Sequence, residues 1–249
     1  VFNIARDRLG EKPIYWGILN NIFFVGSELK ALESSYDFKS NVNKNSLSLL
    51  LKFNYIPSPY SIYDNIYKLG PGKLLKFDLK SKKYSEHSFW DLSKVMDLGK
   101  SCQFEKNDFN TEKKFTKIFH QVINEQMQAD VPLGAFLSGG IDSSLVVSAM
   151  QNQSNTAINS FSVGFENPSY DEAPYARSIA KHLGTKHHEI YINEKDALET
   201  VSLLSKTYCE PFADSSQIPT LLLSKFAKSL VTVSLSGDGG DEFFGGYNS

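Results

Sequence analysis

The stretch from Leu137 to Ser144, LSGGIDSS, constrains the fold more than any other part of the chain. It follows an apolar run over 131–137 that is typical of a buried strand, and it precedes a helical pattern. In that pattern Ile141, Leu145, Ser148 and Ala149 fall on one face of the helix. Glycines let the backbone approach a ligand closely, and the free N–H groups of a helix start point at an anion. The stretch therefore predicts a phosphate-binding turn between a strand and a helix.

The residues within this turn suggest a cation as well as a phosphate. A Walker A loop requires a Lys after its second glycine, and none is present here. Ser138, Ser143 and Ser144 offer hydroxyl donors. Asp142 would repel a phosphate unless a cation lay between them, and Mg²⁺ commonly takes one or two carboxylates plus phosphate oxygens. The alternative interpretation is an ordinary strand-to-helix turn.

A second glycine-rich segment, LSGDGGDEFFGGY over 235–247, carries three acidic residues, Asp238, Asp241 and Glu242. Carboxylates that face one another repel unless a cation, a basic group or a shared proton intervenes. A Mg²⁺ site shared with Asp142 would resolve this repulsion, and an acidic surface loop is the alternative.

Strands and helices are expected to alternate in the second half of the chain. The predicted strands cover 131–137, 157–165, 186–192 and 230–235, and the predicted helices cover 171–183, 194–208 and 215–230. Gly184 should end the first of these helices, and Leu198, Val201, Leu204 and Ser205 should face inward from the second. Such alternation predicts a parallel sheet, whose ligands bind beyond the carboxyl ends of its strands. Loops 138–144, 164–171 and 236–241 meet that condition.

The first half of the chain indicates short strands joined by turns. Strands are expected over 1–5, 13–19 and 22–25, with a turn at Asn20-Asn21, and further β-structure over 62–92. Two short helices are expected over 28–33, with Ser27 as its N-cap, and over 46–53, capped by Asn45 or Ser46. A polar loop is predicted over 97–110, and an amphipathic helix over 111–127 that Asn110 or Thr111 would cap.

Composition excludes several classes of protein. Lys+Arg 26 against Asp+Glu 28 gives a formal charge of −2, which provides no electrostatic argument for binding nucleic acid or a membrane. No apolar run reaches the length of a membrane span. Cys102 and Cys209 form neither a disulfide framework nor a metal site, so we expect a reducing, cytoplasmic setting. The chain begins at Val1 without Met and stops at Ser249, and we interpret it as a fragment of a longer protein.

The turn LSGGIDSS resembles the pyrophosphate-binding loop, SGGxDSS, of the ATP pyrophosphatase superfamily, whose members cleave ATP between its α and β phosphates. Together with LSGDGGDEFFGGY, SVGF and YDEAPYARSIAKHLGTKHHEI, it resembles glutamine-hydrolysing asparagine synthetases. The resemblance implies ATP and Mg²⁺ as cofactors, with Asp142 and Asp241 as metal ligands and Asp238 as the catalytic residue. The ATP contacts that it implies are Leu137, Ser138, Gly139, Gly140, Ser143, Ser144, Val163, Ser236 and Gly237.

The segments RDRLGEKPIYW and FVGSELKAL resemble the closing part of the glutaminase domain of class II glutamine amidotransferases. The resemblance implies that Asp7 helps to hold the amino group of glutamine, whereas a turn aspartate is the alternative. No residue matches the family's N-terminal cysteine nucleophile, so we expect that the chain as given does not hydrolyse glutamine. The implied fold is α/β: a parallel-sheet, ATP pyrophosphatase-like nucleotide-binding domain over 96–249, preceded by the C-terminal part of an α+β N-terminal-nucleophile glutaminase domain over 1–95.

The implied activity is asparagine synthesis by a carbon–nitrogen ligase. ATP and aspartate would give β-aspartyl-AMP and pyrophosphate, and ammonia from glutamine would then displace AMP. Asp238 stands where the synthetases of this family carry Glu, which leaves the identity of the carboxylate open. The alternatives are a related enzyme that adenylates another carboxylate, such as a β-lactam-forming enzyme, and a nucleotide-binding fragment without turnover. The partners implied are small molecules, and the resemblance allows a homodimer.

Overall fold

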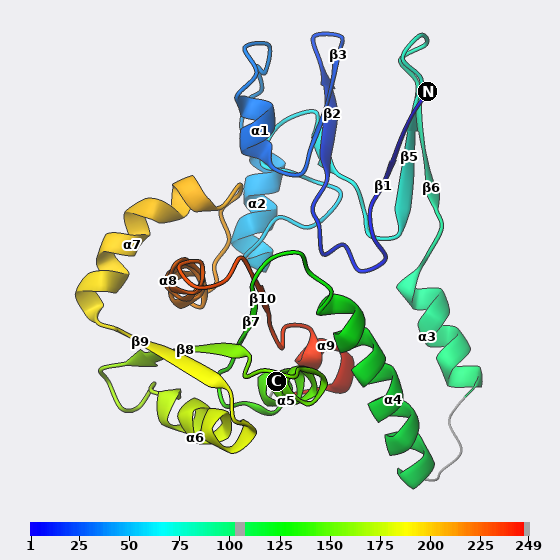
Figure 1. The fold of residues 1–249 in the computed structure, drawn as a ribbon. Coiled ribbons are helices and arrows are strands. Elements are labelled where there is room, and N and C mark those ends of the chain that lie inside the picture. The colour runs from blue at the N-terminus through cyan, green and yellow to red at the C-terminus, as the bar shows by residue number, and fades with distance from the viewer. Residues whose placement is uncertain (103–107, 247–249) are drawn as a thin grey trace. The chain divides into compact units, whose positions relative to one another are not determined.

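The computed structural model describes residues 1–102 and 108–246 (Figure 1). The chain divides into two compact units, one made of Val1–Gln103 and Leu203–Asp214, and the other of Phe104–Ser202 and Ser215–Ser249. We call them the N-terminal unit and the sheet unit. The domain boundary near residue 95 stays a prediction.

The N-terminal unit contains two antiparallel sheets. One has the order β1 (Phe2–Ala5), β5 (Lys73–Phe77) and β6 (Tyr84–Ser88), and the other has the order β3 (Ile22–Gly26), β2 (Tyr15–Leu19) and β4 (Ile66–Lys68). The predicted turn between β2 and β3 is confirmed. Asn20 and Asn21 both have positive φ, 48° and 65°, as a two-residue hairpin turn requires.

The helices of this unit begin at other residues than predicted. In α1 (Leu29–Glu33) the N-cap is Glu28 rather than Ser27. In α2 (Lys44–Phe53) the N-cap is Asn43, whose side-chain oxygen accepts a hydrogen bond of 2.9 Å from the backbone N–H of Ser46. The predicted caps Asn45 and Ser46 are wrong because Asn43, in an extended conformation, already satisfies that donor.

The predicted loop over 97–110 is wrong at both ends. The helix α3 (Leu92–Ser101) occupies its first part, and α4 (Asp108–Gln126) begins within its last part, so that Asn110 and Thr111 lie inside α4 rather than capping it. The side chain of Asp91 caps α3 by accepting the Ser93 N–H at 2.9 Å. No residue of α3 is buried, so the helix is stabilised by this cap at its start rather than by packing in a core. The intervening part of the predicted loop lies outside the described residues.

The sheet unit has the predicted parallel sheet. Its order is β10 (Val233–Leu235), β7 (Leu133–Phe136), β8 (Asn159–Phe165) and β9 (Lys186–Ile192), with parallel pairing throughout. Helices α5 (Ile141–Gln153) and α6 (Ala173–Leu183) cover one face, and α8 (Gln217–Ala227) covers the other (Figure 1). The remaining helices are α7 (Glu194–Thr207), whose last turn belongs to the N-terminal unit, and the short α9 (Gly240–Phe244).

Each face of the sheet has its own core. Ala135 and Leu137 pack with α5, α6 and Ile123 of α4. Phe161 packs on the opposite face with Leu223 and Ala227 of α8. The alternation of side chains along β7 explains the division, because Ala135 and Leu137 belong to the first core and Phe136, between them, packs against the second. Because all four strands run parallel, their carboxyl ends lie at one edge of the sheet.

The predicted inward face of α7 is wrong, and the face of α5 that the sequence pattern selects is largely exposed. On α5 the side chains of Ile141 and Leu145 are 79% and 44% exposed, and the buried residues are Ser143, Val146, Val147, Ala149 and Met150. On α7 Leu198 and Val201 are 73% and 52% exposed, and Ser205 is exposed too. An apolar repeat indicates a helical face, but the neighbouring elements decide which face is covered. The predicted end of α6 is confirmed, since Gly184 caps it with φ 74°.

Candidate nucleotide-binding site

The glycine-rich turn connects β7 to α5 at the carboxyl edge of the sheet. Gly139 has φ +91°, a conformation that favours glycine, and a β-carbon there would lie 2.8 Å from Cβ of Tyr175. Gly140 is the N-cap of α5 and supplies no side-chain cap. The first turn of a 13-residue helix is therefore aimed at this edge, where its free N–H groups favour an anion.

The serine hydroxyls of the turn hold the turn itself together. Ser138 Oγ lies 3.0 Å from Ser143 Oγ and accepts the Gly140 N–H at 3.3 Å. Ser144 Oγ donates to the Gly140 carbonyl oxygen at 2.6 Å. A bound phosphate would therefore replace some of these internal hydrogen bonds rather than meet free hydroxyl groups.

The acidic loop after β10 packs directly on the start of α5. A β-carbon at Gly237 would lie 2.7 Å from the backbone nitrogen of Ser143. A β-carbon at Gly240 would lie 2.6 Å from Oδ2 of Asp142. The fold thus brings the two glycine-rich segments together. At Gly237 and Gly240 the start of α5 lies so close that a side chain would not fit.

The acidic side chains do not converge on one point. Ser236 Oγ donates to Oδ2 of Asp238 at 2.9 Å, and Asp238 is thereby held within its own loop. A β-carbon at Gly246 would overlap Oδ1 of Asp241, so that carboxylate points along α9 toward its C-terminal end. Within residues 1–102 and 108–246, no three His, Cys, Asp or Glu side chains are grouped as a metal site would require.

This donor set fits a metal that takes few protein ligands. Asp142 lies against the backbone of Gly240, so its carboxylate stands at the contact between the loops, whereas the carboxylate of Asp241 lies toward Gly246. Mg²⁺ is commonly held by one or two carboxylates, with the remaining oxygens from substrate phosphates and water. The residues present therefore fit Mg²⁺ together with a phosphate ligand, whereas they do not form an all-protein cage.

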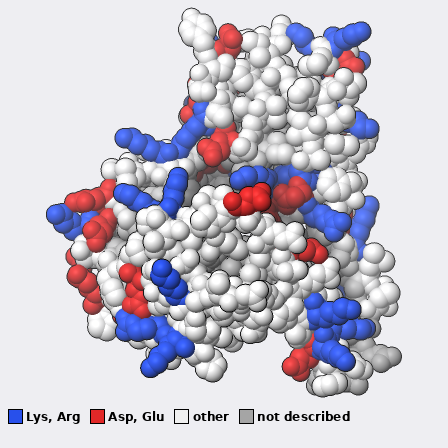
Figure 2. Space-filling view, viewed as in Figure 1, with Lys and Arg blue, Asp and Glu red and all other residues white. Residues whose placement is uncertain are grey.

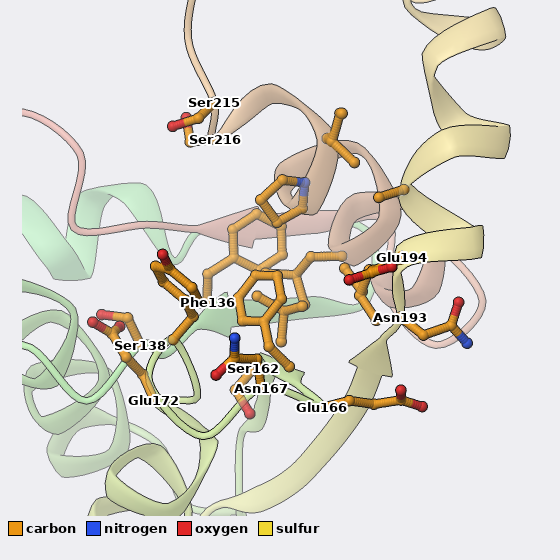
Figure 3. A pocket seen from close by; sticks show the side chains of 18 of the residues that line it. Phe136, Ser138, Ser162, Glu166, Asn167, Glu172, Asn193, Glu194, Ser215 and Ser216 are labelled. Atoms are coloured by element: carbon orange, nitrogen blue, oxygen red, sulfur yellow. The ribbon is translucent and has the colours of Figure 1, made fainter.

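A large cavity opens beside the glycine-rich turn. Its volume is about 1260 Å³, and apolar side chains including Phe136, Val163, Ile192 and Leu223 line it together with polar groups from several loops (Figure 3). Cavities that bind small molecules commonly measure about 300–1,000 Å³ and lie at the carboxyl ends of parallel strands. This cavity is therefore large enough for a nucleotide and stands where the fold class binds one.

Three of the predicted ATP contacts line the cavity: Leu137, Ser138 and Val163. The others border the turn or the acidic loop without lining it: Gly139, Gly140, Ser143, Ser144, Ser236 and Gly237. The carboxylates Asp142, Asp238 and Asp241 are also absent from the lining. The cavity and the contact between the loops are thus adjacent but separate, and Ser138 belongs to both.

Several residues that line the cavity are not among the predicted ATP contacts. Asn193, Glu194 and Lys195 follow β9, and Ser215 and Ser216 precede α8. In Figure 3, Asn193 and Glu194 lie on the opposite side of the cavity from Ser138 and Glu172. The end of β9 was a usable signal, because the carboxyl ends of parallel strands share one edge.

Asp7 lies in the N-terminal unit, where it organises its own loop. Its carboxylate accepts the backbone N–H groups of Leu9, Gly10, Glu11 and Lys12, at 2.6 to 3.2 Å. Desolvation would raise the pKa of this carboxyl, but the four N–H donors outweigh it and lower the pKa. This geometry is that of a turn aspartate, and its role toward glutamine stays a prediction.

Comparison with known proteins identifies the family. Residues 114–249 match the family model described as asparagine synthase, and residues 1–90 match a glutamine amidotransferase domain. The chain belongs to the asparagine synthase family. The first match covers more than half of the chain and contains the whole sheet, the glycine-rich turn and the acidic loop.

Two curated relatives agree with this assignment. The chain is 41% identical over 98% of its length to a putative asparagine synthetase [glutamine-hydrolyzing] 2 of Methanocaldococcus jannaschii, and spans 46% of that protein. It is 32% identical, also over 98% of its length, to asparagine synthetase [glutamine-hydrolyzing] 1 of Bacillus subtilis, and spans 37% of it. An NH₃-dependent NAD synthetase of Campylobacter jejuni is similar in structure over 55% of this chain and 61% of that one, with 16% identity and a TM-score of 0.40.

The surface and the helices add two observations. On the face shown in Figure 2, Lys and Arg side chains are interspersed with Asp and Glu side chains. Among the helices that the structure describes, none is both long and apolar enough to cross a membrane.

Proposed function

We propose that the sheet unit binds Mg·ATP and takes part in the glutamine-dependent synthesis of asparagine. In this proposal ATP adenylates the side-chain carboxylate of aspartate and releases pyrophosphate. Ammonia derived from glutamine then displaces AMP from β-aspartyl-AMP. The chain spans about half or less of the curated relatives that it matches, so the complete reaction is proposed for the full-length protein.

The contact between the glycine-rich turn and the acidic loop carries this proposal. Gly237 and Gly240 lie against Asp142 and Ser143 at the start of α5, and the cavity begins at Ser138 of the same turn. One edge of the sheet thus presents helix N–H groups, carboxylates and an apolar cavity. The N–H groups suit a phosphate chain, the carboxylates suit a divalent cation, and the apolar cavity suits a purine.

Each part has a distinct chemical task. The N–H groups of the turn would hold the phosphates that leave as pyrophosphate, which stabilises the charge that develops on them. Asp142 and Asp241 would hold Mg²⁺, which neutralises phosphate charge when bound. The apolar cavity wall at Val163 would receive the adenine, and the backbone at the end of β8 would contact its edge.

Asp238 is the proposed catalytic residue near the acceptor carboxylate. In the structure one oxygen of its carboxylate, Oδ2, accepts a hydrogen bond from Ser236 Oγ. Since Asp is one methylene shorter than Glu, the position of this loop decides which acceptor can be reached. The nature of the acceptor is therefore the most direct question for experiment.

ATP–pyrophosphate exchange in the full-length protein tests the proposal. We expect exchange that requires both Mg²⁺ and aspartate, because pyrophosphate can re-form ATP only from an acyl-adenylate. If exchange occurs with another carboxylic acid but not with aspartate, the proposed adenylation chemistry stands and aspartate is wrong as the substrate. ATP binding without exchange in the presence of any acid would contradict an adenylating function.

A further inference from the structure

Helix α6 touches the glycine-rich turn. A β-carbon at Gly139 would lie 2.8 Å from Cβ of Tyr175 and 3.0 Å from the backbone nitrogen of Ala176. Both Ala173 and Ala176 are fully buried, so α6 sits close on the sheet at this end. The position of the turn therefore depends on the position of α6.

Arg177, the next residue along α6, ties the helix to β9. Its Nε donates to Oε1 of Glu189 at 2.8 Å, and a terminal nitrogen donates to Oε2 at 2.5 Å. The Arg177 guanidinium lowers the pKa of Glu189, whose side chain is only 16% exposed. A bidentate pair of this kind fixes orientation as well as distance.

The same pair reaches β8 on both sides of Val163. Nε2 of His187 lies 3.3 Å from Oε1 of Glu189 and 3.2 Å from Oγ of Ser162, a fully buried residue at the cavity wall. Arg177 also donates to the hydroxyl of Tyr191 at 3.0 Å. The ring of Tyr191 covers Gly164, where a β-carbon would lie 2.6 Å from Cε1 of that ring.

We propose that Arg177 and Glu189, with His187 and Tyr191, form a clamp that sets the distance between the phosphate-binding turn and the base-binding end of β8. One end of the clamp is the contact of α6 with Gly139, and the other is the pair of contacts at Ser162 and Gly164. In Figure 1 these parts are neighbours, with α6 beside the strands β8 and β9. The clamp residues are positioning residues, and the inference rests on the proposed function.

The prediction is a loss of affinity that depends on the ligand. ATP must contact the turn and β8 at once, whereas inorganic tripolyphosphate needs the turn alone. We expect Glu189→Gln in the full-length protein to raise the Kd of Mg·ATP about tenfold, because misplaced contacts lose their simultaneous fit. The Kd of Mg·tripolyphosphate should stay unchanged. Arg177→Lys, which keeps the charge but not the bidentate geometry, should lie between wild type and Glu189→Gln.

Glu125→Gln is the matched control. It makes the same substitution on α4, where Glu125 accepts a hydrogen bond from Gln121 at the surface, away from the cavity. It should change neither affinity. Thermal unfolding of each variant, recorded beside the titrations, separates a loss of fold from a loss of spacing.

The outcomes distinguish the two proposals. A wild-type chain that binds neither ligand would overturn the nucleotide-binding function and the clamp with it. Wild-type binding of both ligands, with a Glu189→Gln variant that binds both as wild type does, would overturn the clamp and leave the function intact. Equal weakening of ATP and tripolyphosphate would also overturn it, because that result reflects damage to the turn rather than to the spacing.

Discussion

Gly237 of the acidic loop lies so close to Asp142 of the glycine-rich turn that a β-carbon at Gly237 would stand 3.1 Å from Cβ of Asp142. It would stand nearer still, 2.7 Å, to the backbone nitrogen of Ser143. The two segments are almost 100 residues apart in the chain, and they meet because β10 and β7 are parallel neighbours in the sheet.

This closeness predicts the effect of Gly237→Ala. The added methyl group meets backbone, which cannot rotate away, and forcing an extra methyl into close packing costs about 1–3 kcal/mol. We expect a lower free energy of unfolding and weaker binding of Mg·ATP, measured by denaturant titration and calorimetry. Gly99→Ala is the control, because a β-carbon at Gly99 in α3 meets nothing within 4 Å. Equal behaviour of the two variants would contradict the packing argument.

Asp142→Asn tests the proposed metal ligand. We expect the affinity for ATP to fall about tenfold when Mg²⁺ is present, because one of the carboxylates that would hold the metal is lost. A tenfold change in Kd corresponds to about 1.4 kcal/mol of binding free energy. With EDTA in place of Mg²⁺ the variant should bind ATP at least as well as wild type, because the Asp142 carboxylate then repels the phosphates, and the fold should remain intact. An unchanged affinity in Mg²⁺ would remove Asp142 from the metal site.

Acidification should destabilise the sheet unit through His187 and His188. Burial lowers the pKa of both side chains in the folded protein below the ordinary value of about 6.5. The unfolded chain therefore binds protons first as the pH falls, and the free energy of unfolding decreases between pH 7.5 and 5.5. His187→Gln should make this decrease smaller in urea titrations across that range.

The histidine prediction has a matched control in His182→Gln, at an exposed position of α6. A wild-type slope that His187→Gln leaves unchanged would show that other groups cause the pH dependence. The neighbouring charges that face His187 are Glu189 of β9 and Arg177 of α6, so the variant must be compared with wild type at constant salt.

Glu210 should stabilise the N-terminal unit through a largely buried ion pair. Its carboxylate pairs with Lys68 and accepts the backbone N–H of Ile62 at 2.7 Å, and the two charged side chains are only 9% and 17% exposed. Glu210→Gln leaves the ammonium group of Lys68 without its counter-charge, which costs about 3–5 kcal/mol in such pairs. Asp97→Asn, at an exposed pair with Lys100, should leave the free energy of unfolding nearly unchanged.

The sequence alone was enough to predict the parallel sheet, the glycine-rich turn between a strand and a helix, and the family. Local signals sufficed for these features, because an apolar run before Gly139-Gly140 and a helical pattern after Ile141 define a turn without reference to distant residues. The same holds for the hairpin at Asn20-Asn21 and the helix end at Gly184, where the backbone conformation itself selects the residue.

Only the tertiary structure decided which residues meet. On α5 the apolar Ile141 is exposed and the polar Ser143 is buried, the opposite of what an apolar pattern indicates. The reason is that α4, the sheet and the acidic loop cover the side of the helix on which Ser143 lies. The contact of Gly237 with Asp142 and the chain of contacts from Arg177 to Ser162 join different elements. Such contacts depend on how strands are ordered and helices are placed, and a local pattern of residues does not encode either by itself.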